Sequence, residues 1–359
     1  MSLIKTAPTT HKFSDDLLQW FDQYGRTHLP WKKNRDPYAI WVSEIMLQQT
    51  QVATVIGYFE RFIQSFPDIA TLANATQEQV LQHWAGLGYY ARGRNLHKAA
   101  QQVVETFDGT MPDQLDQLQS LPGIGRSTAA AILAQAHDQR QAILDGNVKR
   151  VLARIYRVPG YPGQASVHKQ LWEYAEHLTP HKRVADYTQA IMDLGAILCL
   201  RSRPQCSICP VNNHCDAFLE GDADQYPGRK PKTARRQRQA QFLLIDRGEG
   251  NLWLQQRPPI GIWGGLGCLV EIDENDSAQQ WVEKHLSLSV KQIDRLSPFI
   301  HKFTHYDLEI QPIVIKTTVS SQSIVNESAD GDWYDRARIS QVGLPAPIQK
   351  LVEAYLQSI

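Results

Sequence analysis

The sequence predicts two domains of different class, an all-α N-terminal part and a smaller mixed α/β C-terminal part. Apolar residues recur at helical spacing through residues 14–225, and no stretch there alternates with period two over any length. After residues 226–228 the pattern changes, because residues 241–245 and 251–255 have the character of short strands. A chain of 359 residues is long enough for about two domains that each bury their own core.

The N-terminal part consists of helices separated by glycine and proline. A first helix is expected after a possible N-cap at Ser14, because Leu17, Trp20, Phe21 and Tyr24 recur at helical spacing. Further helices are expected over residues 40–47, 52–66, 77–84 and 95–107. Prolines and glycines fall between these segments and end them.

In the C-terminal part, a glycine-rich turn at residues 247–250 joins the first two strands. A helix over 277–286 and a longer strand over 309–318 follow. The expected organisation is a helical domain at 1–228, a basic linker at 229–240 and an α+β domain at 241–359.

The net charge of zero argues against a general nucleic-acid binder, but the charge is unevenly distributed. Residues 229–240 hold six basic residues and no acidic one, between parts with net charges of −1 and −5. We interpret this segment, called the basic strap, as a linker that also contacts phosphate. No run of eighteen apolar residues and no signal peptide is evident, which predicts a cytoplasmic, non-membrane protein.

Four cysteines lie within seventeen residues, with the spacing C-x6-C-x2-C-x5-C. They are Cys199, Cys206, Cys209 and Cys215. Four thiolates this close together can hold one zinc ion or one iron–sulfur cluster, and the spacing does not distinguish the two. Disulfides are the less favoured reading, because the only other cysteine is Cys268 and disulfide frameworks belong mainly to small secreted domains.

Residues 121–129 predict a tight turn between two helices, with Gly123 and Gly125 in the turn. Glycine lets the backbone approach a ligand closely, and the N–H groups that open the second helix then face an anion. This helix–hairpin–helix arrangement suits a DNA phosphate. The alternative is a helix C-cap and turn with no ligand.

Two carboxylates are candidates for acid–base chemistry. Glu44 is a single acid within an apolar and amide stretch, where a raised pKa would suit a general acid. Asp145 precedes Gly146 and Asn147, a pattern equally typical of an N-cap or a turn. An exposed helical glutamate is the alternative for Glu44.

Several long motifs in the same order resemble the MutY-type adenine DNA glycosylases, which are relatives of endonuclease III. They lie at residues 43–56, 86–100, 121–129, 143–154 and in the cysteine run. The resemblance is strong over residues 14–228 and looser beyond. It implies a helix–hairpin–helix glycosylase fold with a 4Fe–4S cluster on the four cysteines, and a Nudix-like C-terminal domain. The implied substrate is double-stranded DNA with adenine opposite 8-oxo-7,8-dihydroguanine (8-oxoguanine) or guanine, and the adenine is flipped out.

The resemblance also implies roles for individual residues. Glu44 matches the acid that protonates adenine at N7, and Asp145 matches the carboxylate that stabilises the sugar cation. Asn147 supports Asp145 and the catalytic water. Gln48 and Tyr89 enter the duplex near the lesion, and Trp31 and Gln189 line the adenine pocket.

Ser127 distinguishes between relatives. Bifunctional relatives carry a lysine at this point, whose amine forms a Schiff base and cuts the strand. Serine cannot do this, so we expect a monofunctional enzyme that leaves an abasic site.

The C-terminal domain lacks the glutamate-rich helix that a Nudix hydrolase needs, so no hydrolase activity is expected there. The family's 8-oxoguanine recognition loop reads Phe-Ser-His. Here it is Phe303, Thr304 and His305, and threonine keeps the hydroxyl but adds a methyl group.

Two other functions remain open at this stage: an enzyme acting on oxidised pyrimidines like endonuclease III, and a DNA-binding protein that has lost its chemistry. Ser127 disfavours the first, and the pair Glu44 and Asp145 disfavours the second. A bacterial monomer acting on the nucleoid is the expected context.

Overall fold

The computed structural model describes residues 10–230, 235–258, 261–303, 306–318 and 331–359. By its contacts the chain divides into two compact units. Unit 1 comprises residues 1–75 and 95–231, and unit 2 comprises residues 76–94 and 232–359. No feature of the sequence indicates that residues 76–94 group with the C-terminal residues. The domain boundaries predicted above stay a prediction.

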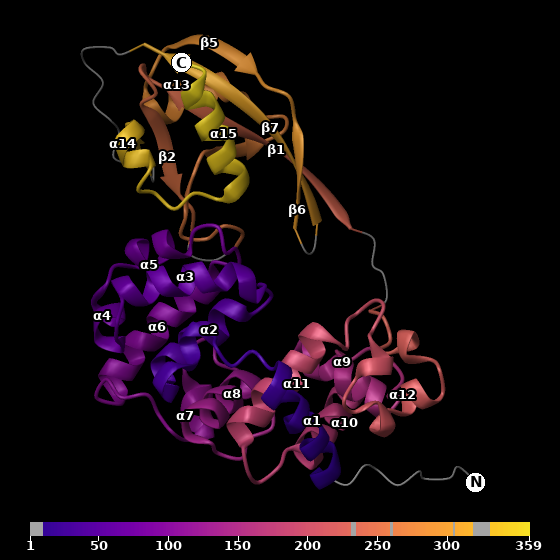
Figure 1. Cartoon of the computed structure of the whole chain (residues 1–359). Helices are drawn as coiled ribbons and strands as arrows, with labels where there is room; N and C mark the ends of the chain where they lie inside the picture. The colour runs from indigo at the N-terminus through magenta and orange to yellow at the C-terminus, as the bar shows by residue number, and fades with distance from the viewer. Residues whose placement is uncertain (1–9, 231–234, 259–260, 304–305, 319–330) are drawn as a thin grey trace. The chain divides into compact units, whose positions relative to one another are not determined.

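Unit 1 is all-α, as predicted (Figure 1). Its helices are α1 (Thr10–Tyr24), η1 (Pro30–Arg35), α2 (Pro37–Leu47), α3 (Val52–Ser65), α4 (Ile69–Asn74), most of α6 (Ala91–Thr106), α7 (Leu115–Ser120), α8 (Arg126–His137), α9 (Gly146–Ile155), α10 (Ala165–Leu178), α11 (Val184–Ile197), η2 (Cys206–Ile208), η3 (Asn212–His214), α12 (Asp216–Leu219) and η4 (Ala223–Gln225). α5 (Gln77–Trp84) belongs to unit 2.

The core of unit 1 forms around α11, which packs against α1, α8 and α9. α9 shows why: Val148, Val151, Leu152 and Ile155 fall on one face at helical spacing, and all four are buried. α11 is buried on most of its surface, so the polar side chains that it carries must find partners inside the protein.

The N-cap expected at Ser14 is wrong. α1 begins at Thr10, and the buried Ser14 lies inside it. Its hydroxyl donates to the carbonyl of His11, 3.0 Å away. The backbone is therefore already helical at Ser14, and the hydroxyl bonds back to the preceding turn instead of capping a helix.

Unit 2 contains one mixed sheet with a helix on each face. Its strands are β1 (Arg236–Asp246), β2 (Leu252–Gln256), β3 (Gly267–Cys268), β4 (Val270–Asp273), β5 (Val290–Arg295), β6 (Phe299–Lys302), β7 (Tyr306–Thr317) and β8 (Gly331–Tyr334). Its remaining helices are α13 (Ala278–Leu286), α14 (Arg336–Ile339) and α15 (Ala346–Gln357). The C-terminal part is thus α and β, as predicted.

β1 and β7 run parallel along their whole length at the centre of the sheet. Phe242 and Leu244 of β1 face the core under α15, whereas Leu243 and Ile245 face the core under α13. Because both faces are covered there, residues 242–245 of this strand form a continuous apolar run with no alternation.

The structure differs from the sequence prediction at the basic strap. β1 begins at Arg236 and pairs there with Tyr306, so the end of the strap is strand and not linker. The predicted helix at 277–286 is present as α13, with Ser277 as its N-cap. No helix among the described residues is long and apolar enough to cross a membrane.

Candidate active site

A cavity of about 670 Å³ lies in unit 1, between η1, α2, α8, α11 and the turn that precedes α9. Its wall brings together these predicted site residues: Trp31, Glu44, Gln48, Ser127, Asp145, Asn147 and Gln189. Their positions span the chain from η1 to α11, so the fold has assembled them from distant segments. The cysteines, Gly123, Gly125, Tyr89 and Phe303 do not line this cavity.

Glu44 reaches the cavity from α2, whose start is fixed by the Asp36 carboxylate accepting from two backbone N–H groups. Its Oε1 accepts a hydrogen bond from Nε2 of Gln135, 2.8 Å away on α8. Burial raises the pKa of Glu44 to about 7, although the bond from Gln135 works against this, and the nearby Asp145 raises it further. The carboxyl can therefore carry a proton near neutral pH and release it.

Asp145 is the N-cap of α9, and its Oδ1 accepts from the Val148 N–H at 2.7 Å. The sequence left open whether Asp145 is an N-cap or a functional carboxylate. Because it caps α9 and also lines the cavity, the two interpretations are compatible. Burial raises its pKa, and backbone N–H groups together with the cations Arg150 and Lys149 partly offset that rise. The N–H groups and the two cations thus favour the ionised carboxylate of Asp145, whereas burial disfavours it.

Asn147 connects Asp145 to α11 and to the cysteine segment. Its Nδ2 lies 3.4 Å from Asp145 Oδ2, and its Oδ1 accepts from Arg150 Nη2 at 2.9 Å. Arg150 also donates to the carbonyls of Gly195 and Cys199, at 2.6 and 2.7 Å. Arg150 therefore fixes the turn that precedes α9 to α11 and to the cysteine segment, a role that sequence reasoning did not assign to it.

Gln189 is buried on α11, and its Nε2 donates to Asp193 Oδ1 at 2.7 Å. The fully buried Asp193 also accepts from Arg26, through the backbone N–H at 2.7 Å and the guanidinium at 2.7 and 2.9 Å. Among the described residues no hydrogen bond engages the Oε1 oxygen of Gln189, so this oxygen can accept one from a group in the cavity. Sequence reasoning missed Arg26 and Asp193, and the only available signal was an acid within the apolar α11.

Ser127 stands in the first turn of α8 and lines the same cavity as Asp145. Its hydroxyl oxygen accepts the N–H of Leu144 at 2.9 Å. A lysine at this position could not accept that bond. Gln48 Nε2 lies 3.5 Å from the hydroxyl of Thr128 in the next position of α8.

The turn between α7 and α8 has the glycine geometry expected of a phosphate-binding hairpin. Gly123 has a φ of 82°, and a Cβ there would lie 2.9 Å from the Cβ of Asn95. Gly125 is the N-cap of α8, with open space around it and no side-chain cap. The N–H groups that open α8 are therefore available to an anion.

Tyr89, in unit 2, is a half-exposed aromatic residue with a φ of 49°. It follows Gly88, also at positive φ, and the Arg92 guanidinium lies 5.5 Å from the centre of its ring. A left-handed conformation is uncommon for a bulky residue, and such residues gather at functional positions.

The four clustered cysteines are unbridged, and their segment is held by Arg154. This buried guanidinium donates to Cys199 Sγ at 3.2 Å and to the Leu200 carbonyl at 2.7 Å. Burial raises the pKa of Cys209 to about 12, and Cys199, Cys215 and Cys206 raise it further. Among the described residues no group of three or more His, Cys, Asp or Glu side chains is arranged to hold a metal ion.

The predicted recognition loop lies in unit 2 between β6 and β7. Phe303 is partly buried, and its N–H donates to the Tyr306 carbonyl at 2.9 Å. Its ring contacts those of Trp263, His301 and Tyr306. Thr304 and His305 lie outside the described residues.

Comparison with known families finds two matches along the chain. Residues 42–177 match the HhH-GPD superfamily of base excision DNA repair proteins, and residues 241–354 match the NUDIX domain. These ranges include Glu44, the α7–α8 turn and Asp145 in the first case, and the sheet of unit 2 in the second.

Curated relatives extend the similarity over nearly the whole chain. The chain is 37% identical to an adenine DNA glycosylase of Buchnera aphidicola from Acyrthosiphon pisum, over 98% of this chain and 99% of that one. It is 47% identical to the adenine DNA glycosylase of Homo sapiens, over 59% of this chain and 40% of the human one.

Two solved structures share the fold of the helical part. A thermostable thymine-DNA glycosylase is 27% identical, with a TM-score of 0.54 over 59% of this chain and 97% of its own. An endonuclease III–DNA complex is 20% identical, with a TM-score of 0.51 over 61% and 99%. The second likeness bears on the fold alone.

Proposed function

Because this chain belongs to the adenine DNA glycosylase family, within the HhH-GPD superfamily of base excision repair proteins, we propose that it removes adenine opposite 8-oxoguanine or guanine. It is a DNA glycosylase, an enzyme that hydrolyses the N-glycosyl bond of adenine. The opposite base, the roles of single residues and the cofactor are parts of the proposal. The observation that carries it is one cavity lined by two half-buried carboxyl groups, those of Glu44 and Asp145.

In this proposal Glu44 is the acid. Its pKa of about 7 leaves much of the carboxyl protonated at neutral pH, so it can give that proton to N7 of the flipped-out adenine. Protonation turns adenine into a neutral leaving group. Gln135 holds the carboxyl oxygen in place while the proton moves.

Asp145 stabilises the positive charge that develops on the deoxyribose as the bond breaks. The backbone N–H of Val148 and the charge of Arg150 favour its ionised form, which this role needs. Asn147 is proposed to orient Asp145 and the attacking water. Two carboxyl groups in one site thus take different roles through their surroundings.

Ser127 supports a monofunctional enzyme that leaves an abasic site. It lines the cavity with Asp145, but its hydroxyl is engaged with the backbone and offers no amine for a Schiff base. Gln48 and Tyr89 are proposed to enter the duplex, and the half-exposed ring of Tyr89 suits such a wedge. Trp31 and Gln189 are proposed to line the base pocket.

We propose a single 4Fe–4S cluster on Cys199, Cys206, Cys209 and Cys215. The side chains as placed do not form a ready metal site, but the type of donor supports the proposal, because all four thiols are unbridged and close enough to perturb one another's pKa. When bound, the cluster supplies a cross-link that orders residues 199–215. Arg154 would hold this segment through Cys199 Sγ and the Leu200 carbonyl.

The C-terminal unit is proposed to read the opposite base through Phe303, Thr304 and His305. The ring cluster around Phe303 supports this, since it anchors one side of the hairpin. Double-stranded DNA of a bacterial nucleoid is the proposed substrate, and the likeness to bacterial relatives supports it.

The test is base release from a duplex with one adenine opposite 8-oxoguanine, with and without hot alkali afterwards. Strand breakage only after alkali is expected from the wild type, and little release from Glu44→Gln or Asp145→Asn, although both variants bind the duplex. Breakage without alkali would contradict the monofunctional reading. If either variant released adenine at the wild-type rate, the carboxyl group that it lacks would have no part in the mechanism.

A further inference from the structure

A cavity of about 480 Å³ lies in unit 2 at the place where β1 and β7 end. We call it the basic cavity, because four basic side chains from separate segments line it: Arg247, Lys291, Lys316 and Arg336. The carboxylates of Asp246 and Glu249 and the last residue, Ile359, share the lining, and the four cations outnumber them. The function proposed above uses none of these residues.

The acidic groups of the basic cavity do not neutralise its cations. Asp246 is buried, and it accepts the backbone N–H of Gly248 and the hydroxyl of Tyr355, both at 2.7 Å. Among the residues that the structure describes, no ion pair joins any of the four cations to a side-chain carboxylate. An anion that enters the cavity therefore finds positive charge still available.

Two of the cations, Lys291 and Lys316, lie beside each other on paired strands. Gln292 of β5 pairs with Lys316 of β7, and the register shifts between Val290 and Gln292, so Lys291 is the extra residue of a bulge. Both lysines are exposed and line the same cavity, and like charges on neighbouring strands destabilise a sheet. An anion bound between them would offset that repulsion.

The two arginines of the basic cavity are held in place. The guanidinium of Arg247 lies 4.6 Å from the centre of the Trp333 ring, and Arg336 donates to the carbonyl of Ile359 at 3.0 Å. A guanidinium that is already fixed loses less conformational freedom when it binds an anion.

The free edge of the sheet adjoins this cavity. β5 is the last strand of the sheet, and among the described strands it pairs only with β7. Ile293 of β5 is 40% exposed and pairs with Ile315, on the side of the sheet that α13 covers. Gln292 and Lys316 lie on the other side, so an extended segment added to this edge would place alternate residues beside an apolar and a basic surface.

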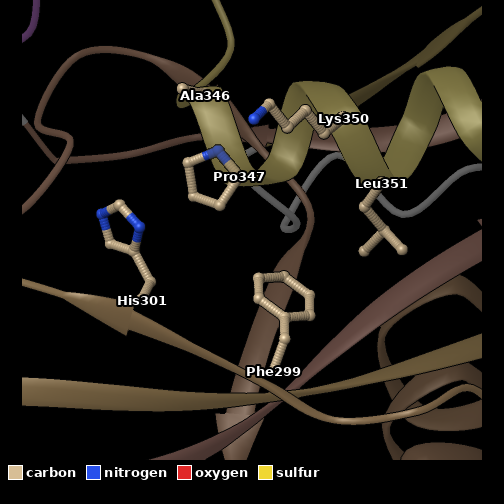
Figure 2. Close-up of a pocket in the computed structure, with 6 residues that line it drawn as sticks. All are labelled: Phe299, His301, Ala346, Pro347, Lys350 and Leu351. Atoms are coloured by element: carbon tan, nitrogen blue, oxygen red, sulfur yellow. The ribbon is translucent and has the colours of Figure 1, made fainter.

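The predicted recognition hairpin lies at the other end of the sheet. β1 and β7 run parallel from the pair Arg236 and Tyr306 to the pair Asp246 and Lys316, and these ten steps of strand span roughly 33 Å. The cavity between β6 and the start of α15 lies at the hairpin end (Figure 2). A partner that binds at the basic cavity would therefore leave the hairpin free.

We propose that the basic cavity and the free edge of β5 bind an acidic, extended segment of another protein. The segment adds a strand beside β5, with its acidic residues toward Lys291 and Lys316 and its apolar residues beside Ile293. A second copy of this chain would bring the same lysines to the edge and be repelled. A nucleic acid would meet the cations but has no backbone amide groups for a strand edge and no alternating apolar side chains.

The experiment measures binding of fluorescent peptides to the full chain by anisotropy. One octapeptide alternates aspartate and valine, and a second has the same composition with all aspartates in one block. Lys291→Glu and Lys316→Glu reverse the charge at the cavity. Lys350→Glu is the matched control, because Lys350 is an equally exposed lysine of unit 2 that lines the cavity of Figure 2 instead.

We expect the alternating peptide to bind at least tenfold more tightly than the block peptide. Each cavity variant should weaken that binding at least tenfold, and the control should bind as the wild type does. Failure of the alternating peptide to bind, equal binding of the two peptides, or unchanged binding by both cavity variants would overturn the proposal.

Affinity for an undamaged duplex, measured with the same variants, tests whether DNA occupies the basic cavity. If Lys291→Glu and Lys316→Glu weaken duplex binding but leave peptide binding unchanged, the cavity contacts DNA and the proposal is wrong. Both variants should release adenine from the mispaired duplex at the wild-type rate, because neither residue belongs to the active-site cavity. This readout keeps a failure of the present proposal distinct from a failure of the proposed function.

Discussion

At the residue scale, the carboxyl group of Glu44 illustrates how burial selects a protonation state. Burial raises its pKa to about 7, and the bond from Gln135 limits that rise because the amide N–H favours the charged oxygen. An acid that must hold a proton loses activity above its pKa. Base release should therefore fall about tenfold per pH unit above neutrality.

We predict that Gln135→Leu moves this alkaline limb to higher pH. Loss of the donor removes the interaction that lowers the pKa of Glu44, so the carboxyl stays protonated further into the alkaline range. The measurement is the single-turnover rate of adenine release against pH. Gln139→Leu is the control, since its amide bonds instead to the Asp113 carbonyl. An unchanged limb in Gln135→Leu would rule out Glu44 as the titrating acid.

The second residue-scale prediction concerns the amide of Gln189. Asp193→Asn supplies an N–H that competes for the contact with Gln189, and it leaves Arg26 without its carboxylate partner. The Gln189 amide can then turn, and the oxygen available to the adenine amino group is lost. We expect base release to slow by about 10- to 100-fold, equivalent to roughly 1.4–2.8 kcal/mol.

The preference of the enzyme for adenine over hypoxanthine is a more specific measure of the effect of Asp193→Asn. Hypoxanthine carries an oxygen where adenine carries its amino group, so Asp193→Asn should reduce the preference for adenine over hypoxanthine. Asp186→Asn is the matched control, because Asp186 lies on α11 and also pairs with an arginine, but at the surface. Equal losses on both bases would point to a structural defect rather than to a turned amide.

At the element scale, the site depends on how closely α9 and α11 approach. Gly195 of α11 lies against Asn147, and a Cβ at this glycine would come within 2.6 Å of the Asn147 Cβ and 3.2 Å of its Cα. The Gly195 carbonyl also accepts from Arg150, which holds Asn147. Gly195 thus permits the contact that positions Asn147 and the turn that precedes α9.

We predict that Gly195→Ala destabilises unit 1 by about 1–3 kcal/mol, because the added methyl group meets the Asn147 Cβ, which cannot rotate away from the backbone that carries it. The rate of base release should fall with it, since Asn147 is displaced. Gly57→Ala is the control: a methyl group on this α3 glycine would make only an ordinary contact, 3.5 Å from Nη1 of Arg61, and alanine there should be neutral or stabilising by up to about 1 kcal/mol. Thermal unfolding and base release measure both effects, and a Gly195→Ala protein as stable as wild type would contradict the argument.

The helices and strands differ in how well the sequence predicts them. Helical spacing identified most helices of unit 1, and the strands at 241–245 and 251–255 were identified by composition and turns. The short strands β5 and β6 were not foreseen, because they lie at the sheet edge and carry mostly exposed side chains. Local pattern indicates an element only where one face is consistently buried.

Long-range pairs explain the part of the site that was missed. Arg26 and Asp193 are 167 positions apart, and no local pattern links them. Glu44 and Asp145 were identifiable because each is chemically unusual in its own segment. The sequence therefore indicated the two candidate carboxyl groups, whereas only the fold shows which distant residues orient other side chains of the cavity.

At the scale of the whole molecule, the basic strap gives a neutral chain a local positive charge, but part of that charge is already neutralised. Arg235 pairs with Asp307 at 3.2 Å, and Arg238 pairs with Glu271 at 2.7 Å. These arginines flank or belong to β1 and serve the sheet of unit 2. Among the described residues, Arg229 and Lys230 are exposed and form no ion pair.

We predict that the two halves of the strap contribute differently to DNA binding. Each phosphate contact adds about 0.9 to the slope of log affinity against log salt concentration. Arg229→Gln with Lys230→Gln should reduce the slope by up to about 2, because both cations are free to replace counterions. Arg235→Gln with Arg238→Gln should change it little, since these guanidiniums already have carboxylate partners. If the second pair lowers the slope more than the first, the arginines must exchange Asp307 and Glu271 for phosphate, and the start of β1 would then be the DNA contact.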